Sequence, residues 1–185
     1  MKTTSIESIL VAIASISVVI ATIIFEKQVE QTPSPSNHFV ARVIFSEAAH
    51  QCSNHERKLI ASVIKNRINH EGFGKLQSLE RVARQKNAFS CINDPNNSNW
   101  KLTKNHQDID SRHIWQQCLK LSSGDFNPII GRSGRPIVYF HDKSISKPAS
   151  WNNKWWTAHK ELETEHFIFY SVTKTHQNSP KTQGA

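Results

Sequence analysis

The sequence predicts an α+β fold, mostly helical with a small antiparallel sheet, preceded by one apolar N-terminal helix. Three observations lead to this prediction. Apolar residues recur at helical spacing through the middle of the chain, β-branched and aromatic residues gather in 136–141 and 166–172, and residues 9–25 carry no charge.

The uncharged run Ile9–Phe25 is at the short limit for crossing a bilayer. Lys2 precedes it, and the positive-inside rule then favours a cytoplasmic N-terminus. A cleaved signal peptide is the alternative, with Val19–Ala21 as the cleavage site. We expect residues 1–30 to be an uncleaved, single-pass signal-anchor in the inner (cytoplasmic) membrane, with the following domain on the periplasmic, extracytoplasmic side.

Residues 31–185 carry 21 Lys and Arg against 12 Asp and Glu, a net charge of +9 with neutral histidines. Such a charge suggests an anionic partner: nucleic acid, a membrane surface or an acidic polymer such as cell wall. Behind an export signal, nucleic acid is the least expected of the three. The simpler interpretation is a soluble basic surface, which charge alone does not exclude. We expect a monomer that binds no nucleic acid.

The three cysteines allow at most one intramolecular disulfide, and Cys52 could pair with Cys91 or Cys118. None has the spacing of a zinc ligand set, and neither His55 nor His70 is followed four residues later by a second histidine. The sequence therefore predicts neither a metal nor a cofactor.

Capping signals place the first helices. Residues 31–37, rich in proline and serine, are expected to form a linker to a domain at 38–173, with Ser36 or Asn37 capping the first helix. Ser53 has capping-box spacing and opens a second helix, which we expect to end at the glycines 72 and 74.

Arg67 lies on the apolar side of that second helix, where an arginine more often binds nearby carbonyl groups than acts in catalysis. The remaining elements follow from composition and periodicity. They are a short helix at 78–85, a polar loop at 87–99, a helix at 108–121, antiparallel strands at 136–141 and 166–172, and a flexible tail at 174–185.

Glu47 is the first candidate for chemistry, because it falls in the apolar stripe formed by Val40, Val43 and Ile44. Burying a carboxylate costs several kcal/mol unless it is paired or protonated. A carboxyl group held against apolar walls retains its proton more readily, as a general acid for breaking a glycosidic bond must. Alternatively, the helix rolls slightly and Glu47 lies at a solvated edge.

Aromatic residues suggest a sugar-binding surface. Trp151, Trp155 and Trp156 cluster in the sequence with Tyr139 and His141. Aromatic faces stack on the C–H faces of sugar rings, and their polar tips reach hydroxyl groups. The alternative is that one or two of these residues belong to the core.

Five sequence blocks in order resemble the SleB-like cell wall hydrolases, the family of spore-cortex-lytic enzymes and related bacterial and phage proteins. The blocks span about 130 residues and are Ala41–Ala49, Ala61–Arg67, Phe89–Asp94, Val138–His141 with Ser150–Trp151, and His166–Tyr170. The resemblance implies a lysozyme-like domain that cleaves the glycan strand of peptidoglycan as a lytic transglycosylase, with Glu47 as the catalytic acid.

The sequence departs from the family pattern at two positions. Gln51 stands where a second acidic residue is usual, and Ala88 stands where a glutamine usually precedes the Phe-Ser-Cys block. A single carboxylate is sufficient if the sugar's own C6 hydroxyl closes a 1,6-anhydro ring. Inverting and retaining hydrolysis need a second carboxylate, for which Asp94 is the nearby candidate.

The resemblance also suggests which residues bind substrate. On one side of the cleft these are Phe89, Ser90 and Asn93, and on the opposite wall Tyr139, His141, Trp151 and Tyr170. Cys91 has no evident basic partner, so it is interpreted as a small buried hydrophobe rather than a nucleophile.

Other functions stay open on the sequence alone. The anchor segment is only weakly apolar and is followed by a single domain, which suggests a phage signal-anchor-release endolysin. The alternative is an anchor that stays fixed in the membrane. The domain could also be an N-acetylmuramoyl-L-alanine amidase, although most such amidases use zinc, or a non-catalytic cell-wall-binding module in which Glu47 is structural.

Overall fold

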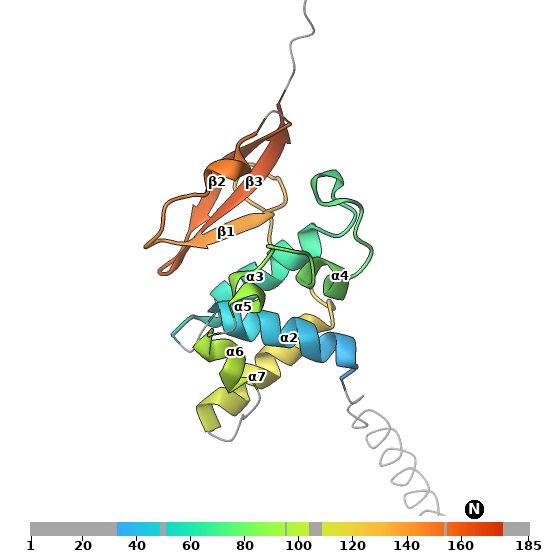
Figure 1. Ribbon diagram of the computed structural model, residues 1–185, viewed down its shortest axis with the longest axis vertical. Helices are drawn as coiled ribbons and strands as arrows, with labels where there is room; N and C mark the ends of the chain where they lie inside the picture. Colours follow the sequence, from blue (N-terminus) through green and yellow to red (C-terminus); the bar gives the residue numbers. More distant parts are fainter. Residues whose placement is uncertain (1–32, 49–50, 95, 104–108, 154, 176–185) are drawn as a thin grey trace, which may run out of the picture. The chain divides into compact units, whose positions relative to one another are not determined.

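The computed structural model describes residues 33–48, 51–94, 96–103, 109–153 and 155–175 (Figure 1). The expected signal-anchor at 1–30 and almost all of the expected tail lie outside these ranges. Within them, no helix combines the length and apolar character needed to cross a membrane.

The described elements are helices followed by a three-stranded antiparallel sheet, which confirms the α+β class. The helices are α2 (Pro35–Ala48), α3 (Asn54–Asn66), η1 (Glu71–Phe73), α4 (Leu79–Ala83), α5 (Ser90–Asn93), α6 (Ser98–Leu102), α7 (Ile109–Ser122) and η2 (Ala149–Trp151). The strands are β1 (Tyr139–Asp142), β2 (Trp156–Glu163) and β3 (Phe167–Lys174).

Helix α2 is the central helix of the domain. It packs against α3, α4, α5, α6 and α7, and Figure 1 shows α7 running alongside it. The apolar stripe of Val40, Val43 and Ile44 is buried as predicted, and Ala41 and Phe45 are buried beside it. A helix that is apolar on nearly all sides is stable only when neighbours surround it, which explains its central place.

The first helix begins earlier than predicted. Pro35 is its first residue, and the Ser34 hydroxyl, rather than Ser36 or Asn37, accepts a hydrogen bond from the backbone N–H of Asn37. Proline suits the first helical position because its fixed φ matches a helix and its missing N–H would have no partner there. The expected linker at 31–37 therefore overlaps the first turn of α2.

Helix α3 begins as predicted and ends sooner. Ser53 and Glu56 form a complete capping box. The helix stops at Asn66, whereas the sequence suggested Gly72 and Gly74, because Asn69 takes up a left-handed conformation with φ 57°. Asparagine tolerates this conformation well enough to turn the chain without glycine.

The polar region 87–99 is more ordered than expected, since it contains α5 and the start of α6. Asn97 caps α6 by accepting a hydrogen bond from the backbone N–H of Trp100. The helix expected at 78–85 is the shorter α4, capped by Ser78.

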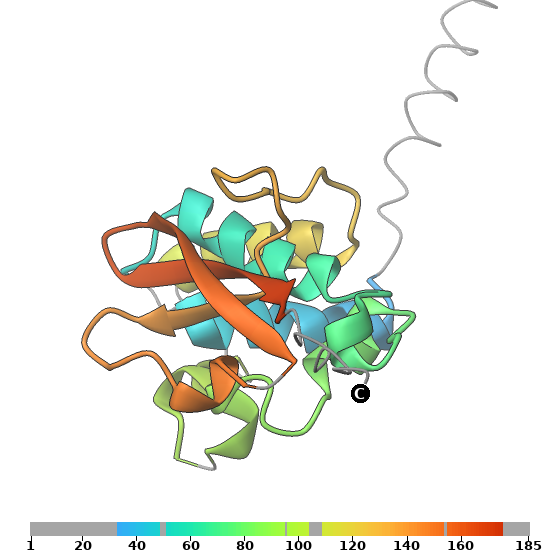
Figure 2. The same cartoon turned by 90° about the horizontal axis from the view of Figure 1, so that it is seen from above.

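The sheet has the order β1-β3-β2 and packs on α3; Figure 2 shows its strands crossing one side of the helices. The pairing of the two predicted strands is confirmed, with Tyr139 opposite Tyr170. Strand β2 was not predicted. Its register shifts between Lys160 and Leu162, which interrupts the alternation by which a strand is recognised.

The core has two parts. One lies around α2 and α7, and the other lies between α3 and the sheet, where Leu59, Ile60 and Val63 face Ile137 and Phe169. Phe140 of β1 packs against both parts and so joins the sheet to α2. The three cysteines are free thiols, and all are buried.

Candidate active site

A cavity of about 750 Å³ lies beside the end of α2, within the range of about 300–1,000 Å³ usual for ligand sites. Its walls come from the end of α2, the segment 85–90, strand β1, η2 and the turn between β2 and β3. The residues that line it include Glu47, Gln51, Arg67, Phe73, Ala88, Phe89, Ser90, Tyr139, His141, Asp142, Trp151 and His166.

Glu47 is half-buried in the wall of this cavity, near the C-terminal end of α2. Its Oε1 accepts a 2.9 Å hydrogen bond from the backbone N–H of Cys91 and a 3.1 Å bond from the hydroxyl of Ser90. Both donors belong to the start of α5. They fix the carboxyl group in one orientation while part of it still faces the cavity.

Arg67 also lines the cavity and is almost completely buried, with 4% of its surface exposed. Its Nε donates a 2.8 Å hydrogen bond to the carbonyl oxygen of Val138, as expected for an arginine that binds carbonyl groups. Burial lowers the pKa of Arg67 to about 10, although the charges of Tyr139 and Glu47 act in the opposite direction. The guanidinium therefore remains charged at neutral pH.

The Arg67 guanidinium also organises the aromatic side chains around it. Its Cζ lies 4.7 Å from the ring centroid of Phe73, 5.2 Å from that of Phe89 and 5.4 Å from that of Tyr139. A buried cation over an aromatic face is attracted by the ring quadrupole. Arg67 thus joins Phe89 and Tyr139, two aromatic residues that line the cavity.

The aromatic wall consists of Tyr139, His141 and Trp151. Tyr139 and Trp151 are stacked, with ring centroids 4.6 Å apart and planes inclined by 15°. Behind them, the Tyr170 hydroxyl lies 3.0 Å from Nε2 of His141, whose Nδ1 lies 2.7 Å from the carbonyl oxygen of Asp142. Since Nδ1 must donate to that carbonyl, Nε2 of a neutral His141 accepts from Tyr170.

Most of the residues expected at the site thus meet around one cavity. Glu47, Phe89, Ser90, Tyr139, His141 and Trp151 all line it. Two expected residues do not. Asn93 turns back to donate a hydrogen bond to the carbonyl oxygen of Phe89, and Tyr170 is buried behind His141.

A second carboxylate does line the cavity beside Glu47, but it is not the candidate Asp94. Asp94 does not line the cavity, and its Oδ1 accepts a hydrogen bond from the backbone N–H of Asn96. Asp142, at the end of β1, does line it. Hydrogen bonds from Ser144 hold the pKa of Asp142 below its usual value, and the nearby His166 and His141 add to this effect. Asp142 is therefore the second carboxylate of the cavity wall.

Sequence reasoning also overlooked Ser46, whose hydroxyl is buried in the wall and has no hydrogen-bond partner in the described part of the chain. Such a group is available to a bound ligand. The sequence does offer a signal for both residues, because each is adjacent to a predicted site residue. Ser46 precedes Glu47, and Asp142 follows His141.

Cys91 is buried, and burial together with the charge of Glu47 raises the pKa of its thiol far above the usual value. This fits its interpretation as a small hydrophobe. Burial and the charge of Glu56 also raise the pKa of the Cys52 thiol, to about 12, with Arg57 opposing.

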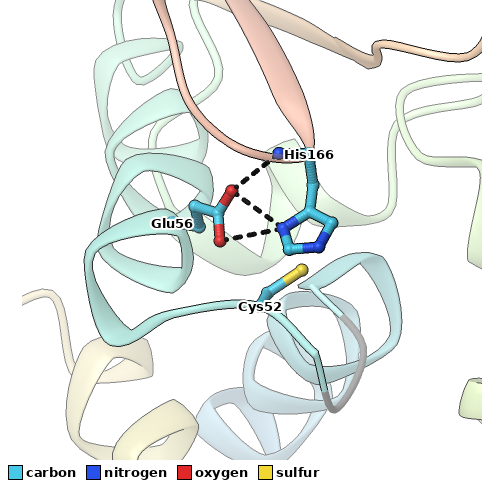
Figure 3. Close-up of side chains that lie close together, drawn as sticks. All are labelled: Cys52, Glu56 and His166. Carbon is cyan, nitrogen blue, oxygen red and sulfur yellow. Dashed lines mark hydrogen bonds and ion pairs between the residues drawn. The ribbon is translucent and has the colours of Figure 1, made fainter.

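Cys52, Glu56 and His166 form a compact group (Figure 3), and two of them, Cys52 and His166, line the cavity. His166 Nδ1 lies 3.1 Å and 3.2 Å from the two carboxylate oxygens of Glu56, and the backbone N–H of His166 donates to Oε1. Burial would raise the pKa of Glu56, but hydrogen bonds from Ser53, Thr164 and His166 outweigh it and lower the value to about 2. In the described part of the chain, this is the group whose donor atoms could hold a metal ion.

Comparison with known proteins identifies a family for this chain. The family model described as Cell Wall Hydrolase matches residues Gln51–Tyr170, well over half of the chain. No curated protein and no solved structure matches. The match begins four residues after Glu47 and contains four of the five sequence blocks. The resemblance to SleB-like hydrolases is thus confirmed, and the chain belongs to the cell wall hydrolase family, whose substrate is peptidoglycan.

Proposed function

We propose that the protein is a lytic transglycosylase that cleaves the glycosidic bond between N-acetylmuramic acid and N-acetylglucosamine. The observation that carries this proposal is the position of Glu47 in the cavity wall, oriented by the donors of Ser90 and Cys91. Family membership supports peptidoglycan as the substrate. A lysozyme-like arrangement of helices and sheet around this cleft is part of the same proposal.

In this mechanism Glu47 protonates the glycosidic oxygen as the bond from C1 of the muramic acid breaks. The same group, now a carboxylate, takes the proton of that sugar's C6 hydroxyl, whose oxygen bonds to C1 and closes the 1,6-anhydro ring. Proton transfer by a positioned side chain contributes about 10²–10⁴-fold to a rate. Water does not take part, so a single carboxylate is sufficient, in agreement with Gln51 at the usual position of a second acid.

The surroundings of Glu47 suit a polysaccharide. Tyr139 and Trp151 offer a stacked aromatic surface to sugar rings, and the Ser46 hydroxyl can bond to an acetamido or hydroxyl group. The basic surface would draw the domain toward the acidic wall polymer.

The test is mass spectrometry of the products that the purified chain releases from peptidoglycan, compared with those of Glu47→Gln. Products that end in 1,6-anhydro-muramic acid, absent with Glu47→Gln, are expected. Products with reducing muramic acid ends would mean that water attacks C1 of the muramic acid. Asp142 would then be the first residue to test as a second catalytic carboxylate. Freed stem peptides together with intact glycan would indicate an amidase. Binding to the wall without any released product would indicate a non-catalytic binding module.

We further propose that residues 1–30 hold the enzyme in the inner membrane with its domain outside, and that the protein acts as a signal-anchor-release endolysin. The support is the weakly apolar run that contains Ala12, Ala14 and Ser15. Replacing these three with leucines should abolish lysis and leave the activity of the purified chain intact. Unchanged lysis would rule out release.

A further inference from the structure

We propose that Cys52, Glu56 and His166 form a binding site for a zinc-class divalent metal ion beside the cavity. This inference does not depend on the proposed reaction. The residues come from three places: the turn before α3, the first turn of α3, and the turn between β2 and β3. The fold brings together Glu56 and His166, which are 110 residues apart in the sequence, and Figure 3 shows the three side chains facing one another.

The donor set and its spacing suit zinc. One sulfur, one carboxylate oxygen and one imidazole nitrogen lie within 4.8 Å of one another. Zinc binds these atoms at about 2.0–2.3 Å in a tetrahedral arrangement, so the donors must approach one another by about 1 Å. A soft thiolate combined with imidazole selects zinc-class ions over magnesium and calcium, which prefer oxygen ligands.

The carboxylate of Glu56 is already oriented as a ligand. Its Oε2 accepts a 2.8 Å hydrogen bond from the backbone N–H of Ser53, and its Oε1 a 3.1 Å bond from that of His166. A metal ion would replace the contact between Nδ1 of His166 and the carboxylate, and it would share the carboxylate with the hydroxyl groups of Ser53 and Thr164. The two backbone bonds can remain as the outer contacts that orient metal-bound carboxylates.

Local charge also favours a cation here, although the domain as a whole is basic. Glu56, Asp142 and Glu165 each place negative charge near the Cys52 sulfur, and the positive charge of Arg57 partly opposes them. Cys52, His166 and Asp142 all line the cavity, so an ion can enter from solvent and complete its coordination with water. The Cys52 thiol proton passes to solvent on binding, with no change in oxidation state.

The experiment is a titration of the purified full-length chain with Zn²⁺, followed by calorimetry, and with Co²⁺, followed by absorption spectroscopy. We expect one tight site per chain and a thiolate-to-cobalt charge-transfer band. Cys52→Ser should abolish the band, and His166→Ala should weaken Zn²⁺ binding by roughly 10–100-fold or more. The matched controls are Cys118→Ser, a buried thiol outside the group, and His55→Ala, an exposed histidine on α3.

The proposal is overturned if the wild-type chain gives no charge-transfer band, or if Cys52→Ser keeps both the band and the affinity. Zinc binding without a thiolate band would mean adventitious binding by surface histidines and would also overturn it. Since the wild-type spectrum and the conservative Cys52→Ser variant decide these outcomes, the test still works if His166→Ala does not fold.

Discussion

The backbone N–H of Cys91 donates a 2.9 Å hydrogen bond to Oε1 of Glu47, which joins the first turn of α5 to the end of α2. This bond links two residues 44 positions apart and is made by a backbone group, so substitution of the Cys91 side chain need not remove it. It holds the proposed acid in place from one side, while the cavity leaves the other side open.

Ser90→Ala removes the second donor to Glu47 and leaves the first. Negative charge develops on Glu47 as it gives its proton to the glycosidic oxygen, and a hydrogen bond to a charged group contributes about 1.5–3 kcal/mol, so we expect cleavage to slow by about ten- to a hundredfold. The initial rate of muropeptide release measures this effect. The matched control is Ser98→Ala, an exposed serine at the start of α6 that does not line the cavity; an equal loss there would contradict the prediction.

Asp142→Asn tests the single-carboxylate mechanism. If the C6 hydroxyl is the nucleophile, the variant should keep its anhydro products and lose less than about tenfold in rate, or about 1.4 kcal/mol. Asp94→Asn, which alters a carboxylate outside the cavity lining, is the control. A loss of about a hundredfold or more in Asp142→Asn alone would instead favour attack by water.

Trp151→Ala removes half of the stacked pair with Tyr139. Loss of this contact surface should raise KM for soluble glycan fragments about tenfold and change kcat little, since stacking binds ground state and transition state alike. Trp155→Ala is the control, because Trp155 is 54% exposed and does not line the cavity. A fall in kcat at constant KM would show that Trp151 acts on the chemical step.

Arg67→Met keeps most of the side-chain volume and removes the buried charge. It loses the hydrogen bond to Val138 and the cation–π contacts to three rings, so the free energy of unfolding should fall by about 2–4 kcal/mol. Urea denaturation measures this change. Arg81→Met, at an exposed position of α4, should change stability by less than about 0.5 kcal/mol.

The carboxylate of Glu161 makes the free energy of unfolding depend on pH. Burial would raise its pKa, but hydrogen bonds from Ser133 and Ser171 outweigh it and lower the value from the usual 4.5. Because the folded-state pKa lies below the unfolded one, the stabilisation is present above pH 4.5 and is lost as the pH falls below it.

Glu161→Gln should therefore reduce the free energy of unfolding at pH 7 by about 1–3 kcal/mol and flatten its decline below pH 4.5. Glu165→Gln, at an exposed position, is the control. An unchanged acid profile in Glu161→Gln would show that other carboxylates determine it.

Local signals predicted the parts of the fold that local chemistry determines. The capping box of Ser53 and Glu56 and the antiparallel pairing of β1 with β3 are both present. Strand β2 escaped prediction because Ala158, Lys160 and Glu161 favour helices when taken alone, and only pairing with β3 makes the segment a strand.

The same limit applies to the site. The sequence points to Glu47, which lines the cavity, because a charge interrupts an apolar helical stripe, a pattern visible within a few residues of sequence. The sequence does not reveal the proximity of Cys52 and His166, since that proximity depends on where the sheet packs against α3. Asn93 does not line the cavity, because its side chain donates a hydrogen bond to the carbonyl oxygen of Phe89 at the start of its own helix, a local bond that the sequence does not reveal.

The central position of α2 has a practical consequence for shortened forms of this protein. A chain trimmed to start at Gln51, where the family match starts, would lose the helix around which five others pack, together with Glu47. The apolar surfaces that enclose Val43 and Ile44 would become exposed, so such a fragment should aggregate rather than fold. An expressed form of this domain should therefore begin before Pro33, although the family match begins only at Gln51.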